Sequence, residues 1–171
     1  MGVTSLFDPS VFENLKVVIE GTFYDLDLDG ELEVIDRHDI VDLAYMSRTF
    51  EMTTRLDNSA KNAVECTISL TSNLHAFSQE KISKSTPGCK VKIVFKYFET
   101  EHPLRNIHVL KQVWDKGYKY RVLKHTPIGF NREDSFVTIE ITREKDIFED
   151  DIDLLQEYTA EILHILQIED K

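Results

Sequence analysis

Three aspartates at alternate positions, followed by a glycine, form the pattern in this chain with the clearest chemical meaning. They are Asp25, Asp27, Asp29 and Gly30, within the segment D-L-D-L-D-G-E-L-E-V-I-D at 25–36. A Ca²⁺ ion is bound by about six to eight oxygen ligands, and alternate acids in a tight loop with a glycine at its turn can supply several of them. The spacing matches the first half of an EF-hand loop and raises the hypothesis of a divalent-cation site.

The same segment also fits a β-hairpin, in which acids and leucines alternate on either side of an Asp-Gly turn. Two observations favour the hairpin. The last loop position holds Asp36, which is shorter than the glutamate that usually completes an EF-hand. The preceding segment contains Val17-Val18-Ile19, and β-branched residues favour strands. We therefore expect a short helical turn near 9–14, a strand over 16–28, a return strand from Leu32, and no metal site.

A second group of chemically capable side chains follows a strand-like segment and consists of Glu99, Glu101 and His102. A carboxylate beside an imidazole can transfer a proton or bind a metal. This group supports an alternative hypothesis, an enzyme with its site at a sheet edge.

Other signatures of catalysis and cofactor binding are missing from the sequence. The six histidines form no H-E-x-x-H pattern, no G-x-S-x-G elbow is present, and no glycine-rich phosphate loop occurs. We therefore assign no catalytic, cofactor-binding or metal-binding residue and expect a protein that is not an enzyme.

The formal net charge of the chain is −11 over 171 residues. A surface of this sign repels nucleic-acid phosphates. A mixed group of cations and aromatics is the best local exception, and we interpret it as the solvated face of a strand. Its members are Lys111, Trp114, Lys116, Tyr118, Lys119, Tyr120, Arg121 and Lys124. The charge predicts no nucleic-acid partner and favours a protein partner with a basic surface.

Length and composition predict a single globular domain over 1–171. A hydrophobic content of 42% with 30% charged residues is ordinary for a folded chain. No apolar run approaches the roughly 20 residues of a membrane span, and the first residues do not resemble a signal peptide. We expect a cytoplasmic location, no membrane contact, and two buried, reduced thiols at Cys66 and Cys89.

Alternation of apolar and polar residues predicts most elements as strands. The alternation is strictest over 64–71. The other segments with this period are 50–56, 91–97, 118–125 and 136–142. The apolar spacing over 104–114 also suits a helix, but we predict a strand near 106–114 that pairs with 118–125 around the Asp115-Lys116-Gly117 turn.

Helical spacing predicts a short helix over 36–46, capped by Asp36, and a helical turn within 72–89. It also predicts an amphipathic C-terminal helix of about five turns. The apolar seam of that helix contains Ile152, Leu155, Tyr158, Thr159, Ile162 and Leu166. A seam this wide packs on a sheet, and its surplus offers a face for a homodimer.

These elements predict an α+β fold: a mainly antiparallel sheet of about six to eight strands made of hairpins, open or barrel-like, with the long C-terminal helix packed on it. The leading functional hypothesis is a non-catalytic binding or regulatory protein, of inhibitor or immunity type for example, that acts through protein–protein contacts. The alternatives are a calcium-binding protein using Asp25, Asp27 and Asp29, and an enzyme with its site near Glu99, Glu101 and His102.

Overall fold

The computed structural model of the chain describes residues 10–57, 63–73, 88–98, 103–129 and 135–169. Its elements are α1 (Ser10–Leu28), β1 (Leu32–Asp42), β2 (Ser47–Leu56), β3 (Glu65–Ser72), β4 (Lys90–Phe98), α3 (Pro103–Val113), β5 (Tyr118–His125), β6 (Phe136–Arg143), the 3₁₀ turn η2 (Glu149–Asp151) and α4 (Ile152–Glu169). The strands form one antiparallel sheet in the order β1-β2-β3-β4-β6-β5. The predicted α+β class is therefore confirmed, and the described sheet is open, with β1 and β5 as its edges.

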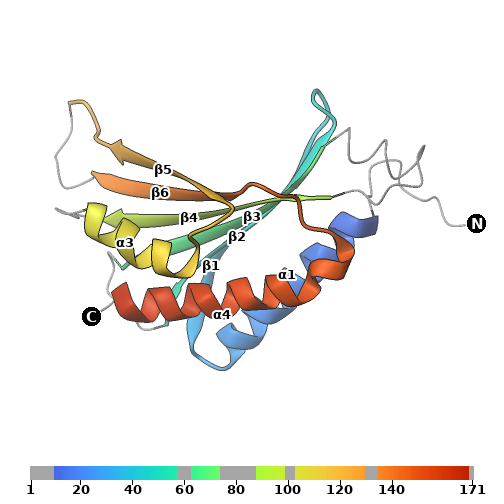
Figure 1. The fold of residues 1–171 in the computed structure, drawn as a ribbon, viewed down its shortest axis with the longest axis horizontal. Coiled ribbons are helices and arrows are strands. Elements are labelled where there is room, and N and C mark those ends of the chain that lie inside the picture. The colour runs from blue at the N-terminus through green and yellow to red at the C-terminus, as the bar shows by residue number, and fades with distance from the viewer. Residues whose placement is uncertain (1–9, 58–62, 74–87, 99–102, 130–134, 170–171) are drawn as a thin grey trace, which may run out of the picture.

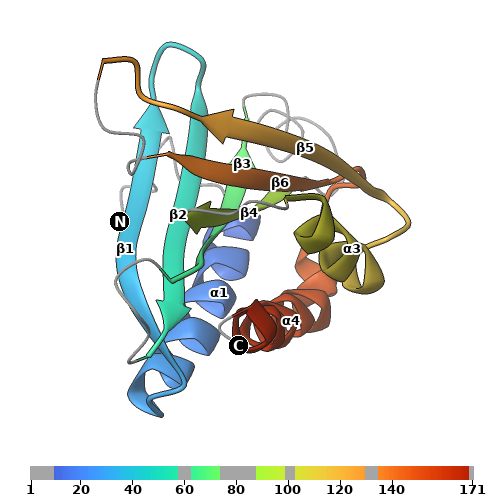
Figure 2. The same cartoon turned by 90° about the vertical axis from the view of Figure 1, so that its left-hand side faces the viewer.

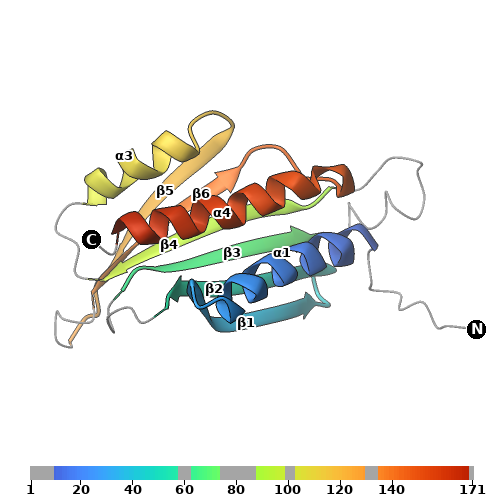
Figure 3. The same cartoon turned by 90° about the horizontal axis from the view of Figure 1, so that it is seen from below.

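All three described α-helices lie on one face of the sheet (Figures 1 and 3). The sheet is strongly twisted, so that β5 and β6 run across the direction of β1 and β2, and the helices occupy its concave side (Figure 2). Strands twist with a fixed hand, and the twist accumulates across a sheet of this width. None of the described helices is long and apolar enough to cross a membrane.

Alternate residues of the central strands face the helices and form the core. On β3 these are Cys66, Ile68 and Leu70, each at most 1% exposed, and β4 and β6 follow the same pattern. The strands predicted over 50–56, 64–71, 91–97, 118–125 and 136–142 are confirmed. Cys66 and Cys89 are both buried, as expected, and burial raises the pKa of the Cys66 thiol.

Helix α1 replaces the strand that the sequence predicted over 16–28. Phe12, Leu15, Ile19 and Phe23 recur at helical spacing, and each is at most 1% exposed. Val17, one of the β-branched residues behind the wrong prediction, lies on the outer side of the helix and is 60% exposed. Intrinsic preferences differ by less than about 1 kcal/mol per residue, so burial of a whole helical face outweighs them.

The Asp29-Gly30 pair ends α1 and does not form the predicted hairpin turn. Gly30 has φ of +72°, a left-handed conformation that glycine adopts without steric cost. The Glu31 N–H donates to the Leu26 carbonyl and the Gly30 N–H to the Asp27 carbonyl, both at 3.0 Å. These two bonds are those of a Schellman C-cap. The predicted hairpin between 16 and 34 is therefore wrong.

Strand β1 continues to Asp42, where the sequence predicted a helix over 36–46. It pairs with β2 along its length, with a bulge between Val34 and Asp36. Asp36 accepts the N–H of Arg37 at 2.9 Å and caps no helix. Asp42 Oδ1 accepts the N–H groups of Ala44 and Tyr45 at 2.9 and 3.0 Å and so begins the turn into β2. The helix prediction is wrong because its apolar residues are not buried on one side.

Residues 103–113 form helix α3, not the predicted strand. Leu110 is fully buried, and Trp114, four residues later, is 2% exposed. The Trp114 ring packs against Phe95 and Tyr158, with centroid distances of 6.0 and 6.5 Å. The helical spacing of these residues was the correct signal. The predicted helical turn within 72–89 falls almost wholly outside the described residues.

Helix α4 confirms the predicted C-terminal amphipathic helix. Its buried residues are Leu155, Tyr158, Thr159, Ile162, Ile165 and Leu166. They face α1, α3, β2 and β3. Thr159 Oγ1 lies 3.0 Å from Thr22 Oγ1 of α1, and the Tyr158 hydroxyl lies 2.8 Å from that of Tyr118. The centre of the apolar seam is therefore covered within the chain, whereas Ile152, Leu154 and Leu163 are only partly buried.

Candidate functional site

The three aspartates of the proposed calcium loop do not surround a common point. Asp25 and Asp27 lie in the last turn of α1, and Asp29 lies in the cap that follows. Asp27 Oδ2 accepts the N–H of Val34 at 3.4 Å and so joins the end of the helix to β1. The described part of the chain contains no group of three or more His, Cys, Asp or Glu placed to hold a metal ion. The loop that an EF-hand requires is not formed.

The residues of the enzyme hypothesis, Glu99, Glu101 and His102, lie outside the described residues. The basic and aromatic residues of 111–124 lie in different environments in the structure. Lys111 lies over the Tyr120 ring at 5.4 Å, and Trp114 is buried in the core. Lys119 and Arg121 pair with Glu144 and Glu140, both at 3.7 Å. This group therefore does not form one continuous basic surface.

Strand β1 combines three properties that suit it for binding another chain. The first belongs to its backbone: β1 pairs with β2 on one side and with no described strand on the other. An edge strand presents N–H and C=O groups that can pair with a further extended segment. β1 has 11 residues, and natural proteins usually shorten or cover an edge of that length.

The second property is a set of exposed apolar side chains on β1 and in the segments next to its two ends. Ile40 and Val41 are 49% and 46% exposed, and Leu43 and Tyr45 in the following turn are 69% and 81% exposed. At the other end of β1, Leu28 of α1 is 86% exposed. Single exposed apolar residues are common, but a group of them marks an interaction site.

The third property is negative charge without local balance. Asp25, Asp29, Glu31 and Asp36 are exposed. The nearest arginines on β1 and β2 are already paired, Arg37 with Glu20 and Arg55 with Glu33. The last turn of α1 contains no basic residue, so its acids lie at the negative end of the helix dipole, where anions are unfavourable. We use the name β1 surface for the outer edge of β1 together with these four acids and the five exposed apolar residues. The apolar residues are Leu28, Ile40, Val41, Leu43 and Tyr45.

A network of ion pairs fixes β1 against α1 and β2. Asp39 accepts from Arg48 Nε and Nη2 at 2.9 and 2.8 Å and from Lys16 Nζ at 2.9 Å. Glu13 pairs with the same two cations. The hydrogen bonds from Arg48 and Lys16 lower the pKa of Asp39 to about 2 despite its partial burial. The edge is held in one conformation, which reduces the entropy cost of adding a strand to it.

The sequence contained the residues of the β1 surface but not their arrangement. The helix predicted over 36–46 contains Asp36, Ile40 and Leu43, and a helix has no strand edge. The available signal was the alternation of charged and apolar residues from Glu31 to Val34, which the bulge between Val34 and Asp36 then interrupts. The strand at the edge of a sheet is determined by pairing between segments that are distant in sequence. The spacing of apolar residues along one segment does not reveal this pairing.

A scan against protein-family models found no match to this chain, and searches of the curated proteins and of the solved structures also returned none.

Proposed function

We propose that this protein is a non-catalytic binding or regulatory protein that holds a basic, extended segment of a partner protein along the β1 surface. The observation that carries the proposal is that an edge with no described partner strand on its outer side, exposed apolar side chains and acids occur together at the β1 surface. A segment that joined β1 as a further strand would form main-chain hydrogen bonds, cover the apolar side chains and neutralise the acids. An inhibitor or immunity-type protein is one form of this function.

The whole chain supports a partner of that charge. Its net charge of −11 repels polyanions and attracts basic proteins over the first steps of encounter. A protein partner, and not a nucleic acid, fits this balance, and we propose that the two proteins meet in the cytoplasm.

The proposal is tested by fluorescence anisotropy with a labelled peptide in which lysine and valine alternate. We expect this peptide to bind, and a peptide in which glutamate and valine alternate not to bind. Affinity should fall as salt rises, because ions screen exposed charges over roughly 10 Å at 0.1 M. Binding that is the same for both peptides, or that is insensitive to salt, would contradict the proposal.

Two further arms locate the binding. A lysine–valine peptide methylated on alternate backbone nitrogens keeps its side chains and loses N–H donors, so its binding should be much weaker. The double variant Asp25→Asn/Glu31→Gln should weaken binding about three- to tenfold. The matched control Asp153→Asn/Glu157→Gln removes the same charge from the exposed side of α4 and should leave affinity within about twofold. Equal losses in both variants would place the peptide elsewhere.

A further inference from the structure

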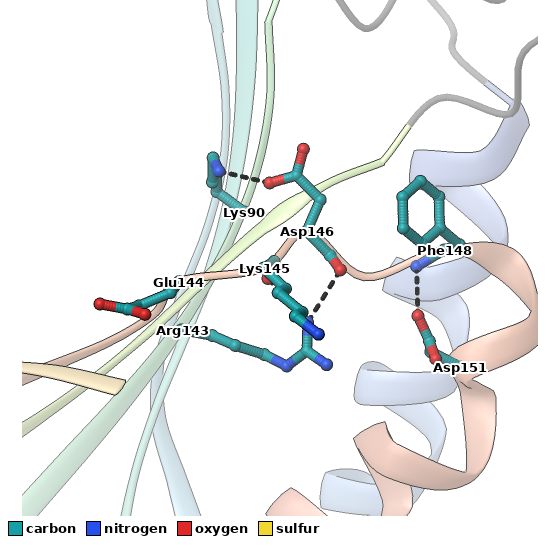
Figure 4. A pocket seen from close by; sticks show the side chains of 7 residues that line it. All are labelled: Lys90, Arg143, Glu144, Lys145, Asp146, Phe148 and Asp151. Atoms are coloured by element: carbon teal, nitrogen blue, oxygen red, sulfur yellow. Dashed lines mark hydrogen bonds and ion pairs between the residues drawn. The ribbon is translucent and has the colours of Figure 1, made fainter. Parts of the chain in front are cut away.

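A pocket of about 380 Å³ opens where the start of β5, the end of β6 and the first turn of α4 meet. Its lining residues are Lys116, Gly117, Tyr118, Arg143, Lys145 and Leu154. It shares Arg143 and Lys145 with an adjoining hollow of about 530 Å³, which Figure 4 shows from close by. Three cations and no carboxylate therefore line the first pocket, in a chain whose net charge is −11.

These cations differ from most others in the described chain, which pair with carboxylates. The paired cations are Lys16, Arg37, Arg48, Arg55, Lys90, Lys96, Lys119 and Arg121. Within the described ranges, Lys116, Arg143 and Lys145 have no carboxylate partner. Positive charge is therefore concentrated in this pocket without being neutralised.

The carboxylates that line the adjoining hollow are engaged elsewhere. Asp146 pairs with Lys90, and Asp151 accepts the Phe148 N–H at 2.8 Å. Glu144 points away from the side-chain ends of Arg143 and Lys145 in Figure 4 and pairs with Lys119. The acids of the adjoining hollow therefore leave the charge of Arg143 and Lys145 available.

Arg143 is held in place by the loop that follows β6. Its Nη1 donates to the carbonyls of Lys145 and Asp146 at 2.7 and 2.8 Å. Its Nε and Nη2 have no partner in the part of the chain that the structure describes. These two nitrogens lie on one edge of the guanidinium, and their N–H groups match two oxygens of a phosphate. Lys145 lines the same two hollows as Arg143.

We infer that this pocket binds the phosphate group of a small phosphate monoester. Arg143 supplies a two-pronged contact, Lys145 and Lys116 supply charge, and Tyr118 and Leu154 contact the organic part of the ligand. The volume is far larger than a bare phosphate needs and falls within the usual range of small-molecule sites, about 300–1,000 Å³. This site is separate from the β1 surface and does not depend on the proposed function.

Isothermal titration calorimetry with phenyl phosphate, inorganic phosphate and benzoate tests the inference. We expect phenyl phosphate to bind more tightly than inorganic phosphate, which lacks the organic part, and more tightly than benzoate, which carries less charge. The double variant Lys116→Gln/Lys145→Gln should weaken phenyl phosphate binding at least about tenfold. Neither lysine side chain makes a hydrogen bond or ion pair within the described residues, so the melting temperature should not change.

The matched control is Lys92→Gln/Lys124→Gln, which removes the same charge from lysines that also have no carboxylate partner within the described ranges. It should leave phenyl phosphate binding within about twofold. The inference is overturned by wild-type protein that does not bind phenyl phosphate, by benzoate that binds as tightly, or by equal losses in the two double variants.

Discussion

Asp25 is an exposed carboxylate in the last turn of α1, where the helix dipole is negative and no basic residue compensates. Asp153 is exposed in the first turn of α4, where the dipole is positive. Asp25→Asn should therefore raise the free energy of unfolding by about 0.3–1 kcal/mol, and Asp153→Asn should lower it by a similar amount. Urea denaturation at low salt measures both. Changes of the same sign would show that the dipole does not determine them.

Asp39 makes stability depend on pH in the acid range. Its pKa is about 2 in the folded protein against an ordinary 3.8, so folding favours its ionised form. The stabilisation is fully present above about pH 4 and is lost as the pH falls towards 2. Asp39→Asn should cost about 1–2 kcal/mol at pH 7, after allowance for solvent screening.

The pH profile separates this effect from a general loss of structure. The difference in free energy of unfolding between wild type and Asp39→Asn should shrink below about pH 4. Asp36→Asn is the control, because the Asp36 side chain is 56% exposed and lies 3.6 Å from the His38 imidazole, with no lysine or arginine partner among the described residues. A difference for Asp39→Asn that stays constant from pH 7 to 2 would exclude the ion-pair explanation.

At the residue scale, the sequence predicted the types of side chain well and their partners poorly. Of the acids of 25–36, Asp25, Asp29, Glu31 and Asp36 are exposed, whereas Asp27 and Glu33 are half-buried. The ion pairs of Asp39 join residues 16, 39 and 48, and no local pattern links these positions. Gly30 carried a signal that was misinterpreted, because an Asp-Gly pair is equally suited to a helix C-cap and to a hairpin turn.

Alanine substitution at two glycines, Gly88 and Gly21, should change the free energy of unfolding in opposite directions. Gly88 precedes the bridge between Cys89 and Ile147, and a Cβ there would lie 2.6 Å from Asp146 Cβ. Gly21 lies in the middle of α1, with nothing within 4 Å of an added Cβ. Gly88→Ala should lower the free energy of unfolding by about 1–3 kcal/mol. Gly21→Ala should raise it by about 0.5–1 kcal/mol, because alanine loses less entropy in a helix.

Chemical denaturation of the two alanine variants measures these changes. A Gly88→Ala protein as stable as wild type would mean that the Cys89–Ile147 bridge can separate without cost.

At the element scale, the strands were predictable where their residues alternate between the buried face and the open face of the sheet. Residues 64–71 and 91–97 alternate between core and open face, and both became strands as expected. Helices α1 and α3 were missed because only their inner face is constrained by packing. Val17 and Val18 suggested a strand, but the period of Phe12, Leu15, Ile19 and Phe23 is the one that burial selects.

For the whole molecule, the net charge predicted that the surface is negative overall, but it did not predict where the acidic and basic side chains lie. The β1 surface lies at one edge of the sheet, and the pocket at Arg143 lies beside β6, four strand spacings away. Strands are spaced about 4.8 Å apart, so the two sites are separated by roughly 19 Å. Screening acts over about 8 Å at physiological salt, so the charges of one site barely affect the other.

The pairing of the first and last helices has a consequence for how this chain folds during synthesis. Thr22 and Thr159 meet across 137 positions of sequence, and α4 covers the same concave face as α1 (Figure 3). Contacts this distant in sequence form late. A nascent chain on the ribosome therefore has a meander of strands with an open apolar side until residues 152–169 emerge. During that interval the chain depends on α1 and α3, or on cellular chaperones, to keep that side from aggregating.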